Sequence, residues 1–348
     1  MYSRILIVGA SAGTHIGGSL MRGAENLGIM ARLVDADKAY AASILIKKWH
    51  WWLMDRRPPY LEQYAKNVLR ECRDFRPDVL IATGLAPLSE TVLEKINRLG
   101  IHAVNYLTDD PWNRKQRSHW FFKTLPLYKN VFNVRRSNIA DLKKAGCRNV
   151  HYLPFGYDPG LHYPEKPAGE EEMRKYQADI LFVGGADGDR LLFIRALIRK
   201  GFRVALYGNY WNRYVETMRY ARGFADPRQL RLATGCAKIS LCLVRRSNRD
   251  DNVMRSYEIP AAGGCMLAED TAQHRAVFGD EGESVYYFSN ELQMVQKASY
   301  LLTHENARKI LRQNAYNKIT QKNNTYADRL KEMLMITASS TEKNHDAS

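Results

Sequence analysis

Short apolar runs alternate with amphipathic stretches along most of the chain. In the first half, mostly apolar runs predict strands at Ile5–Val8, Ala31–Val34, Val79–Ala82, Ala103–Leu107 and Val131–Val134. Between them, apolar residues recur three and four positions apart, which predicts helices at Tyr60–Cys72, Thr91–Leu99 and Ile139–Ala145. Alternating strands and helices predict βαβ units, and therefore a parallel sheet with helices on both faces.

The same alternation begins again in the second half. Strands are predicted at Ile180–Val183, Val204–Tyr207, Ile239–Val244 and Met266–Ala268, and helices at Leu191–Lys200, Asn252–Ala262 and from Glu291 to about Lys322. The stretch Pro159–Gln177 between the halves contains prolines, glycines and three consecutive glutamates, as a linker does.

We therefore predict an α/β protein with two doubly wound domains. The predicted boundaries are an N-terminal domain at 1–160, a linker at 161–178, a C-terminal domain at 179–336 and a flexible tail at 337–348. Ligands of such sheets bind outside the carboxyl ends of the strands, so the cleft between the two domains is the expected site.

Composition narrows the class of protein. The 348 residues are 45% hydrophobic and 26% charged, which excludes disordered and fibrous classes. No apolar stretch approaches the ~18 residues that a membrane span needs, and Ile5–Val8 is too short for the core of a signal peptide. The five cysteines form no CxxC pair, so we expect reduced thiols and a cytoplasmic protein.

The net charge of +15 predicts an anionic partner such as a nucleotide, a nucleic acid or a membrane surface. The excess is concentrated in residues 1–160, which contain 24 Lys and Arg against 14 Asp and Glu.

Two glycine-rich segments follow predicted strands. Gly9–Gly18 contains His15 and departs from the GxGxxG spacing of dinucleotide sites, so we do not interpret it as a cofactor site. In the second half, Gly184 and Gly185 precede a helix start and Arg190, whose guanidinium could pair with phosphate oxygens. A diphosphate is the natural ligand there; the structural alternative is a tight turn with a surface arginine.

The most specific segment is Asp250–Cys265. A helix in this segment carries Arg255 and Glu258 one turn apart, and Gly263 and Gly264 at its end permit a close approach to the next strand. A carboxylate near a helix end can accept hydrogen bonds from two vicinal ribose hydroxyls. The structural alternative is an ion pair at the surface.

Residues Ile180 to about Leu334 resemble the nucleotide-binding half of the GT-B glycosyltransferases, and more narrowly the CgeB-like spore-maturation group of the glycosyltransferase group 1 family. The resemblance is carried by Arg255–Gly264, Phe278–Glu283, Tyr287-Phe288, Arg308 and Tyr326–Leu330, and more weakly by Leu153–Pro159 and Leu107–Pro111.

The resemblance implies two Rossmann-like domains facing each other across a cleft. It also implies transfer of a sugar from a UDP-, GDP- or dTDP-sugar without a bound metal or cofactor. Glu258 corresponds to the second glutamate of the family's E-x7-E motif, which is expected to hold the ribose. Asp250 stands where the family has the first glutamate, which leaves the contact to the donor sugar and a retaining outcome open. Arg190, and Arg245 after a strand, are expected to neutralise the diphosphate.

The acceptor side offers three candidates for a general base, namely His15, Asp109 and Asp110. An inverting transferase needs such a base within hydrogen-bond reach of the acceptor hydroxyl, whereas a retaining one does not. The structural alternatives are a loop histidine and two aspartates that cap the helix after Pro111. The acceptor is expected to be a bacterial surface glycan, a lipid-linked sugar or a protein.

Three tryptophans stand among basic residues in the segment 44–57. Lys47, Lys48, Arg56 and Arg57 with Trp49, Trp51 and Trp52 would suit the inner face of an anionic plasma membrane. Alternatively, the tryptophans pack beneath the domain or line an acceptor pocket.

Two other functions remain open. One is a GT-B-shaped protein that binds a nucleotide-sugar without transferring it, for which Asp250 is the main argument. The other is a basic nucleic-acid-binding protein, although no RRM, KH or helix-turn-helix signature is found and no nucleic acid is expected.

Overall fold

The computed structural model describes residues 2–345, with side chains as far as residue 340. The chain divides into two compact units. The first unit contains the chain up to Phe155, the short segment Ser247–Arg249 and the chain from Thr325 onward. The second unit contains Gly156–Arg246 and Asp250–Asn324.

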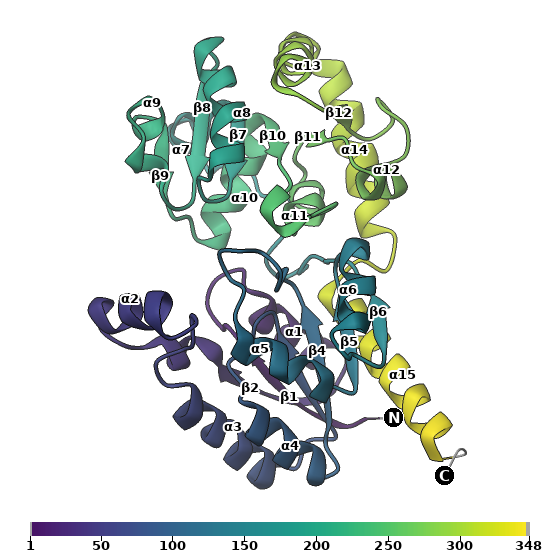
Figure 1. Ribbon diagram of the computed structural model, residues 1–348. Coiled ribbons are helices and arrows are strands. Elements are labelled where there is room, and N and C mark those ends of the chain that lie inside the picture. Colours follow the sequence, from purple (N-terminus) through teal and green to yellow (C-terminus); the bar gives the residue numbers. More distant parts are fainter. Residues whose placement is uncertain (1, 346–348) are drawn as a thin grey trace. The chain divides into compact units, whose positions relative to one another are not determined.

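The first unit is built on a six-stranded parallel sheet with the order β2-β1-β3-β4-β5-β6 (Figure 1). Its strands are β1 (Arg4–Gly9), β2 (Met30–Asp35), β3 (Val79–Thr83), β4 (His102–Leu107), β5 (Asn130–Asn133) and β6 (Val150–Tyr152). Its helices are α1 (Ile16–Asn26), α2 (Ile44–Leu53), α3 (Leu61–Phe75), α4 (Glu90–Arg98), α5 (His119–Thr124), α6 (Ile139–Lys144) and α15 (Tyr326–His345).

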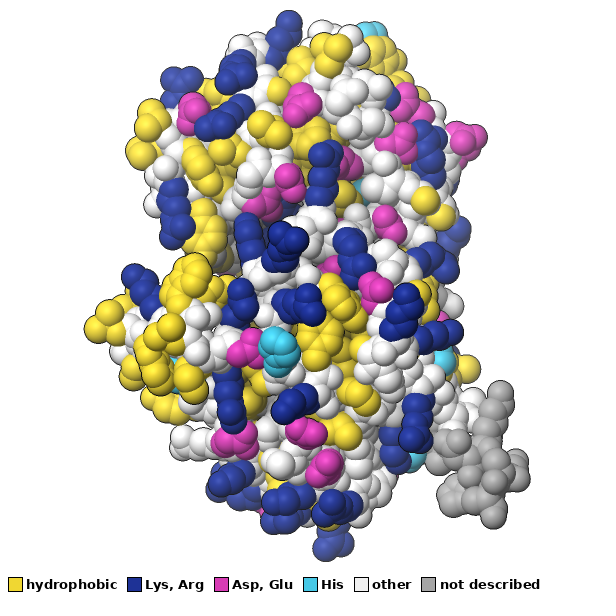
Figure 2. Space-filling model, in the orientation of Figure 1, with side chains coloured by type: hydrophobic (Ala, Val, Ile, Leu, Met, Phe, Trp, Pro, Cys, Tyr) yellow, Lys and Arg dark blue, Asp and Glu magenta, His cyan; other side chains and the backbone are white. Residues whose placement is uncertain are grey.

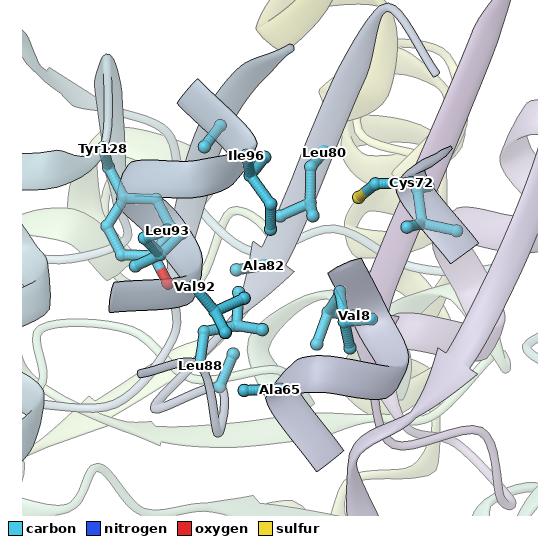
Figure 3. Packing of buried hydrophobic residues seen from close by; sticks show 14 of the residues in the cluster. Val8, Ala65, Cys72, Leu80, Ala82, Leu88, Val92, Leu93, Ile96 and Tyr128 are labelled. Carbon is cyan, nitrogen blue, oxygen red and sulfur yellow. The ribbon is translucent and has the colours of Figure 1, made fainter. Parts of the chain in front are cut away.

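The core of the first unit lies between the sheet and helices α3 and α4. Helix α3 turns one apolar stripe inward, with Ala65, Val68 and Cys72 buried at helical spacing. Figure 3 shows the side chains of Leu80 from β3 and Ile96 from α4 in this cluster. Residues 5–8 of β1 and 79–82 of β3 are buried throughout, so they are continuous apolar runs in the sequence, and this is why these strands could be predicted.

The second unit has its own parallel sheet, with the order β12-β11-β10-β7-β8-β9. Its strands are β7 (Ala178–Val183), β8 (Val204–Tyr207), β9 (Ala221–Gly223), β10 (Ala237–Cys242), β11 (Met266–Glu269) and β12 (Tyr286–Phe288). Its helices are α7 (Glu170–Tyr176), α8 (Gly188–Arg199), α9 (Val215–Met218), α10 (Pro227–Cys236), α11 (Arg255–Ala261), α12 (Ala272–Phe278), α13 (Glu291–Thr303) and α14 (Glu305–Thr320).

The predicted strands are all present, and the strands that the sequence pattern missed are the short ones. Strands β6, β9 and β12 have only three residues each, too few for an apolar run to stand out. The helix predicted from Asn252 begins at Arg255, and the predicted helical region after Glu291 is two helices that meet at His304.

The C-terminal helix corrects the predicted domain boundaries. Helix α15 packs along α1 in the first unit, where a side chain on Gly23 would come within 3.1 Å of the backbone of Ala327. Arg329 Nε also donates to the carbonyl oxygen of Phe155 at 3.1 Å. The predicted C-terminal domain 179–336 and flexible tail 337–348 are therefore wrong, since α15 continues to His345 and Thr337 is buried. Residues 346–348 of that tail lie outside the described residues.

The predicted linker 161–178 is likewise part of the second unit, where it contains α7 and the buried His162. Over the described residues, we find no helix whose length and hydropathy would let it cross a membrane.

Candidate functional site

Strand order identifies one point on the edge of the second sheet. The chain runs outward from β7 to β8 and β9, then returns to place β10 on the other side of β7. At such a reversal, the loops after the two central strands diverge and leave a crevice where ligands of doubly wound sheets bind. Gly184 follows β7 and Arg245 follows β10, so the switch point carries residues of both predicted diphosphate-binding segments.

The loop after β7 is fixed by its neighbours. The Gly184 N–H donates to the Tyr207 carbonyl at 2.8 Å, and Trp211 Nε1 donates to the Gly184 carbonyl at 2.7 Å. A Cβ on Gly208 would lie 2.5 Å from the same carbonyl oxygen, which makes this close approach dependent on glycine. The loop therefore holds the start of α8 at the edge of the sheet, where Asp187 caps the helix by accepting from the Arg190 N–H at 3.0 Å.

Arg190 is more deeply buried than the sequence indicated. Its side chain is 9% exposed, it donates to the Gly185 carbonyl at 3.1 Å, and its guanidinium lies 5.5 Å from the centre of the Phe182 ring. Burial, and then the positive charge of Arg245, lower the pKa of Arg190. Arg190 thus shapes the glycine loop, while the Arg245 side chain, 37% exposed, is the more accessible cation. Both cations lie near Asp187.

Helix α11 brings Arg255 and Glu258 to the same region. Arg255 Nε donates to the carbonyl oxygen of Val183 at the end of β7, at 3.4 Å, and Arg255 forms an ion pair with Glu258. The Glu258 side chain is 3% exposed, and neither of its oxygens accepts a hydrogen bond of ordinary geometry from a described residue. A carboxylate has about four acceptor positions, so hydroxyl donors of a ligand could add to the ion pair with Arg255.

His162 is a residue of this site that the sequence did not indicate. The N–H of Asp158 donates to His162 Nδ1 at 3.1 Å, so in the neutral ring the proton is on Nε2. Nε2 lies 3.6 Å from Glu258 Oε1, and both side chains are buried. The sequence did not indicate His162 because it lies in a segment that looked like a linker. Its contact with Glu258 forms only when that segment packs on α11.

A buried network holds α11 from its other side. His274 Nδ1 donates to the Glu269 carbonyl at 2.7 Å, which leaves Nε2 to accept from the Ser256 hydroxyl at 2.8 Å. The Ser256 oxygen in turn accepts from the Val253 N–H at 3.1 Å. Burial lowers the pKa of His274, so the ring is neutral in the fold. This network positions the helix that carries Glu258.

Asp250 and the two glycines after α11 have different surroundings. Asp250 is 8% exposed, and its N–H donates to the Arg245 carbonyl at 3.3 Å, which connects it to the loop after β10. Gly263 and Gly264 lie at the far end of α11, before β11. Gly263 has a φ of 75°, and a Cβ on Gly264 would lie 2.7 Å from the Thr234 side chain. Both glycines thus allow close packing at the end of α11.

In the first unit, the three candidate bases follow β1 and β4. His15 is exposed and precedes α1, with no hydrogen bond from its ring to another described residue. Asp109 is half-buried beside Gly84, and no described side chain or N–H donates to its carboxylate. Burial, and then the charge of Asp109, raise the pKa of Tyr40 to about 12, which shows that these two groups are near each other.

Asp110, by contrast, accepts hydrogen bonds at both carboxylate oxygens. It is 1% exposed, and Arg249, which belongs to the same unit, donates to both of its oxygens at 2.7 and 3.1 Å. Asn138 Nδ2 and the N–H of Trp112 each donate to Oδ1 at 3.0 Å. The bond from Arg249 raises the pKa of that guanidinium. Asp110 therefore organises the loop after β4, and Asp109 is the carboxylate there that is open to a ligand.

No group of three or more His, Cys, Asp and Glu residues in the described chain is placed to hold a metal ion. The cysteines at 72, 147, 236, 242 and 265 are unpaired.

A known protein family and several solved structures resemble this chain. Residues 190–335 match the family model described as "Glycosyl transferase-like", and no curated protein sequence matches the chain significantly. A sucrose-phosphate synthase from Thermosynechococcus elongatus has a TM-score of 0.67 at 11% identity, over 99% of both chains.

Two further solved structures have the same fold. HepE from Anabaena, in complex with UDP-glucose, has a TM-score of 0.62 at 12% identity, over 97% of this chain and 100% of its own. An α,α-trehalose 6-phosphate synthase from Burkholderia multivorans has a TM-score of 0.62 at 12% identity, over 100% and 98%. The two parallel sheets with their helices are the two Rossmann-like domains of a GT-B fold. Residues 190–335 thus resemble glycosyl transferase-like proteins, and both units together have the GT-B fold.

Proposed function

We propose that the protein transfers a hexose from a nucleotide-sugar to a glycan, a lipid-linked sugar or a protein acceptor, and that it does so in the cytoplasm. The proposal is based on the buried Glu258 carboxylate, which pairs with Arg255 beside the switch point of the second sheet. UDP-glucose is the first donor to test, because HepE was solved with it. The segment Arg255–Gly264 supports the narrower assignment to the CgeB-like group.

In this proposal, Glu258 accepts hydrogen bonds from the ribose hydroxyls, with His162 holding its carboxylate in place. The start of α8 and Arg245 face the diphosphate, while Arg190 keeps the glycine loop in shape. The leaving diphosphate gains negative charge in the transition state, and preorganised cations and N–H groups lower the barrier. Asp109 is our preferred general base for an inverting reaction, since Asp110 is committed to Arg249.

The reaction is proposed to need no metal ion. Asp187 and Asp189 have the spacing of a metal-binding pair, but Asp187 caps α8 and lies within ion-pair distance of Arg190 and Arg245. The positive charges of Arg190 and Arg245 beside the Asp187 carboxylate disfavour the binding of a metal cation there. We expect EDTA to change the transfer rate less than twofold. Loss of activity in EDTA that Mg²⁺ or Mn²⁺ restores would make Asp187 and Asp189 candidate ligands instead.

A thermal-shift panel of UDP, GDP, dTDP and their sugars tests the donor class. A ligand at a hundredfold excess over Kd stabilises the native state by ~2.7 kcal/mol, so one nucleoside diphosphate should raise Tm by several degrees. Stabilisation by none of them, together with stabilisation by an oligonucleotide, would favour the nucleic-acid-binding alternative.

A second candidate is a protein that binds the nucleotide-sugar without transferring it. Asp250 favours it, because a shorter carboxylate occupies the place of the family's first glutamate. Release of sugar or nucleoside diphosphate from a stabilising donor separates the two, since a silent binder shows the thermal shift alone.

A further inference from the structure

Helix α2 of the first unit is mostly apolar and largely exposed. None of its residues is buried, and Leu45, Trp52 and Leu53 are 75%, 77% and 70% exposed. Figure 2 shows the hydrophobic side chains gathered over this helix. The tryptophans therefore do not pack beneath the domain, which removes one alternative left open by the sequence. A contiguous apolar patch of this kind on a folded chain marks an interaction surface.

The chain after α2 holds the helix on a fixed base. Arg56 donates to the carbonyl oxygens of Arg114, Lys115 and Arg117 at distances of 2.9 to 3.2 Å. Asp55 accepts from the N–H of His119, and both Asp55 and Arg56 have a left-handed backbone with φ near 50°. Such conformations are costly for residues other than glycine and persist where the surrounding contacts enforce them. The hydrogen bonds of Asp55 and Arg56 therefore hold the end of α2 in a fixed position on the first unit.

The same bonds place further cations beside the helix. Two of the four cations predicted to face lipid have other partners, since Arg56 binds the three carbonyls and Arg57 pairs with Glu62 at 2.5 Å. Lys47 and Lys48 are exposed on α2. The loop that Arg56 holds adds three exposed cations, Arg114, Lys115 and Arg117. The Asp55 carboxylate accepts from the N–H groups of His119 and Trp120 and lies within ion-pair distance of the His119 ring.

We propose that α2 and the loop 114–117 form a docking surface for an anionic lipid bilayer. Tryptophan, leucine and isoleucine side chains enter the boundary between headgroups and acyl chains, while lysine and arginine attract the anionic headgroups. The ten residues of α2 are about half of what a membrane span needs, so the helix lies in the interface. A second copy of the chain is a poorer occupant, because a two-fold contact through this patch would bring its five cations against one another. The surface is separate from Glu258 and does not rest on the proposed transfer reaction.

Sedimentation with vesicles tests the proposal. Wild-type protein should sediment with vesicles of phosphatidylcholine and phosphatidylglycerol but not with pure phosphatidylcholine, and the bound fraction should fall with salt. Lys47→Gln with Lys48→Gln should lower the partition coefficient roughly tenfold or more. The matched control, Lys143→Gln with Lys144→Gln on α6, removes the same charge from exposed lysines elsewhere on the first unit and should change it little.

A second variant tests the apolar part. Leu45→Gln, Trp52→Gln and Leu53→Gln together replace only side chains that are at least 70% exposed, so the fold should be retained. Vesicle binding should be lost, while Tm and its shift with a nucleoside diphosphate stay unchanged. The proposal is overturned if the wild type ignores anionic vesicles or if the variant still binds them. It is also overturned if sedimentation velocity shows a dimer that these substitutions dissolve, which would assign the patch to a second copy.

Discussion

The carboxyl edges of the two sheets carry candidate residues in opposite states. In the second unit, Arg190, Asp250 and Glu258 are buried, and hydrogen bonds within the loops hold Arg190 and Asp250. In the first unit, His15 is exposed and Asp109 has no hydrogen-bond donor among the described residues. A preorganised edge suits a constant ligand such as a nucleoside diphosphate, because little ordering has to occur on binding. An open edge suits a reactive group that becomes ordered only with its acceptor.

The two neighbouring aspartates of the first unit give the largest expected contrast. Asp109→Asn should lower kcat by roughly 10²–10⁴ if this carboxylate is the base, with Tm and donor affinity unchanged. Asp110→Asn should instead lower the stability by about 1.5–3 kcal/mol, because it weakens a charge-assisted pair with Arg249. Steady-state kinetics and urea unfolding of both variants decide the roles. If the two effects were exchanged, Asp110 would be the base.

In the second unit, Glu258→Ala should weaken donor binding tenfold or more. A hydrogen bond to a charged group contributes about 1.5–3 kcal/mol. Glu258→Gln should be milder, because the amide oxygen still accepts one bond. Titration calorimetry with the stabilising nucleoside diphosphate measures both, and Glu171→Ala at an exposed site of the same unit is the control. Undiminished affinity in a folded Glu258→Ala variant would remove the assignment.

His162, which lies beside Glu258, gives a second and smaller test of the nucleotide site in the second unit. His162→Ala should weaken nucleotide binding less than Glu258→Ala does, roughly threefold, because Nε2 lies 3.6 Å from Glu258 Oε1 and acts on the ligand only by helping to position this carboxylate. Because His162 acts through Glu258, the loss should vanish in a Glu258→Ala background, which a double-mutant cycle detects. An equal loss in both backgrounds would mean that His162 contacts the ligand or only stabilises the fold.

The buried His274 predicts the pH dependence of stability. Its pKa is lowered, first by burial, so the unfolded chain takes up a proton near pH 6.5 while the folded chain does not. Its contribution to stability is therefore present above pH 6.5 and is lost as the pH falls below it. His274→Gln should reduce the slope of unfolding free energy between pH 6.5 and 5 by up to ~1.4 kcal/mol per pH unit. An unchanged slope in urea titrations would show that His274 is protonated in the fold.

The sequence predicted the sheets well because the central strands, such as β1 and β3, are buried and mostly apolar. It also placed Gly184, Arg245 and Glu258 together, since residues after neighbouring parallel strands meet at one edge. It could not predict that α15 returns to the first unit, because Gly23 and Ala327 are recognisable as a pair only once packed.

The sequence alone also could not assign a role to residue types that serve two purposes. A glycine pair after a helix suits both a ligand contact and close packing, and the close packing of Gly264 against Thr234 can be seen only in the structure. The aspartates at 109 and 110 look equivalent until Arg249, more than a hundred residues away in the sequence, binds one of them. The role of His162 could be recognised only in the structure, where the hydrogen bond from the Asp158 N–H to Nδ1 fixes the tautomer of the ring.

Amide hydrogen exchange with and without the stabilising nucleoside diphosphate tests the central claim most directly. The account predicts slower exchange in the loop 184–190 and in 250–258, with the loops 9–17 and 107–112 of the first unit unchanged by the nucleotide alone. Protection confined to the first unit, or protection in neither edge despite saturated binding, would contradict the claim that the second sheet holds the nucleotide.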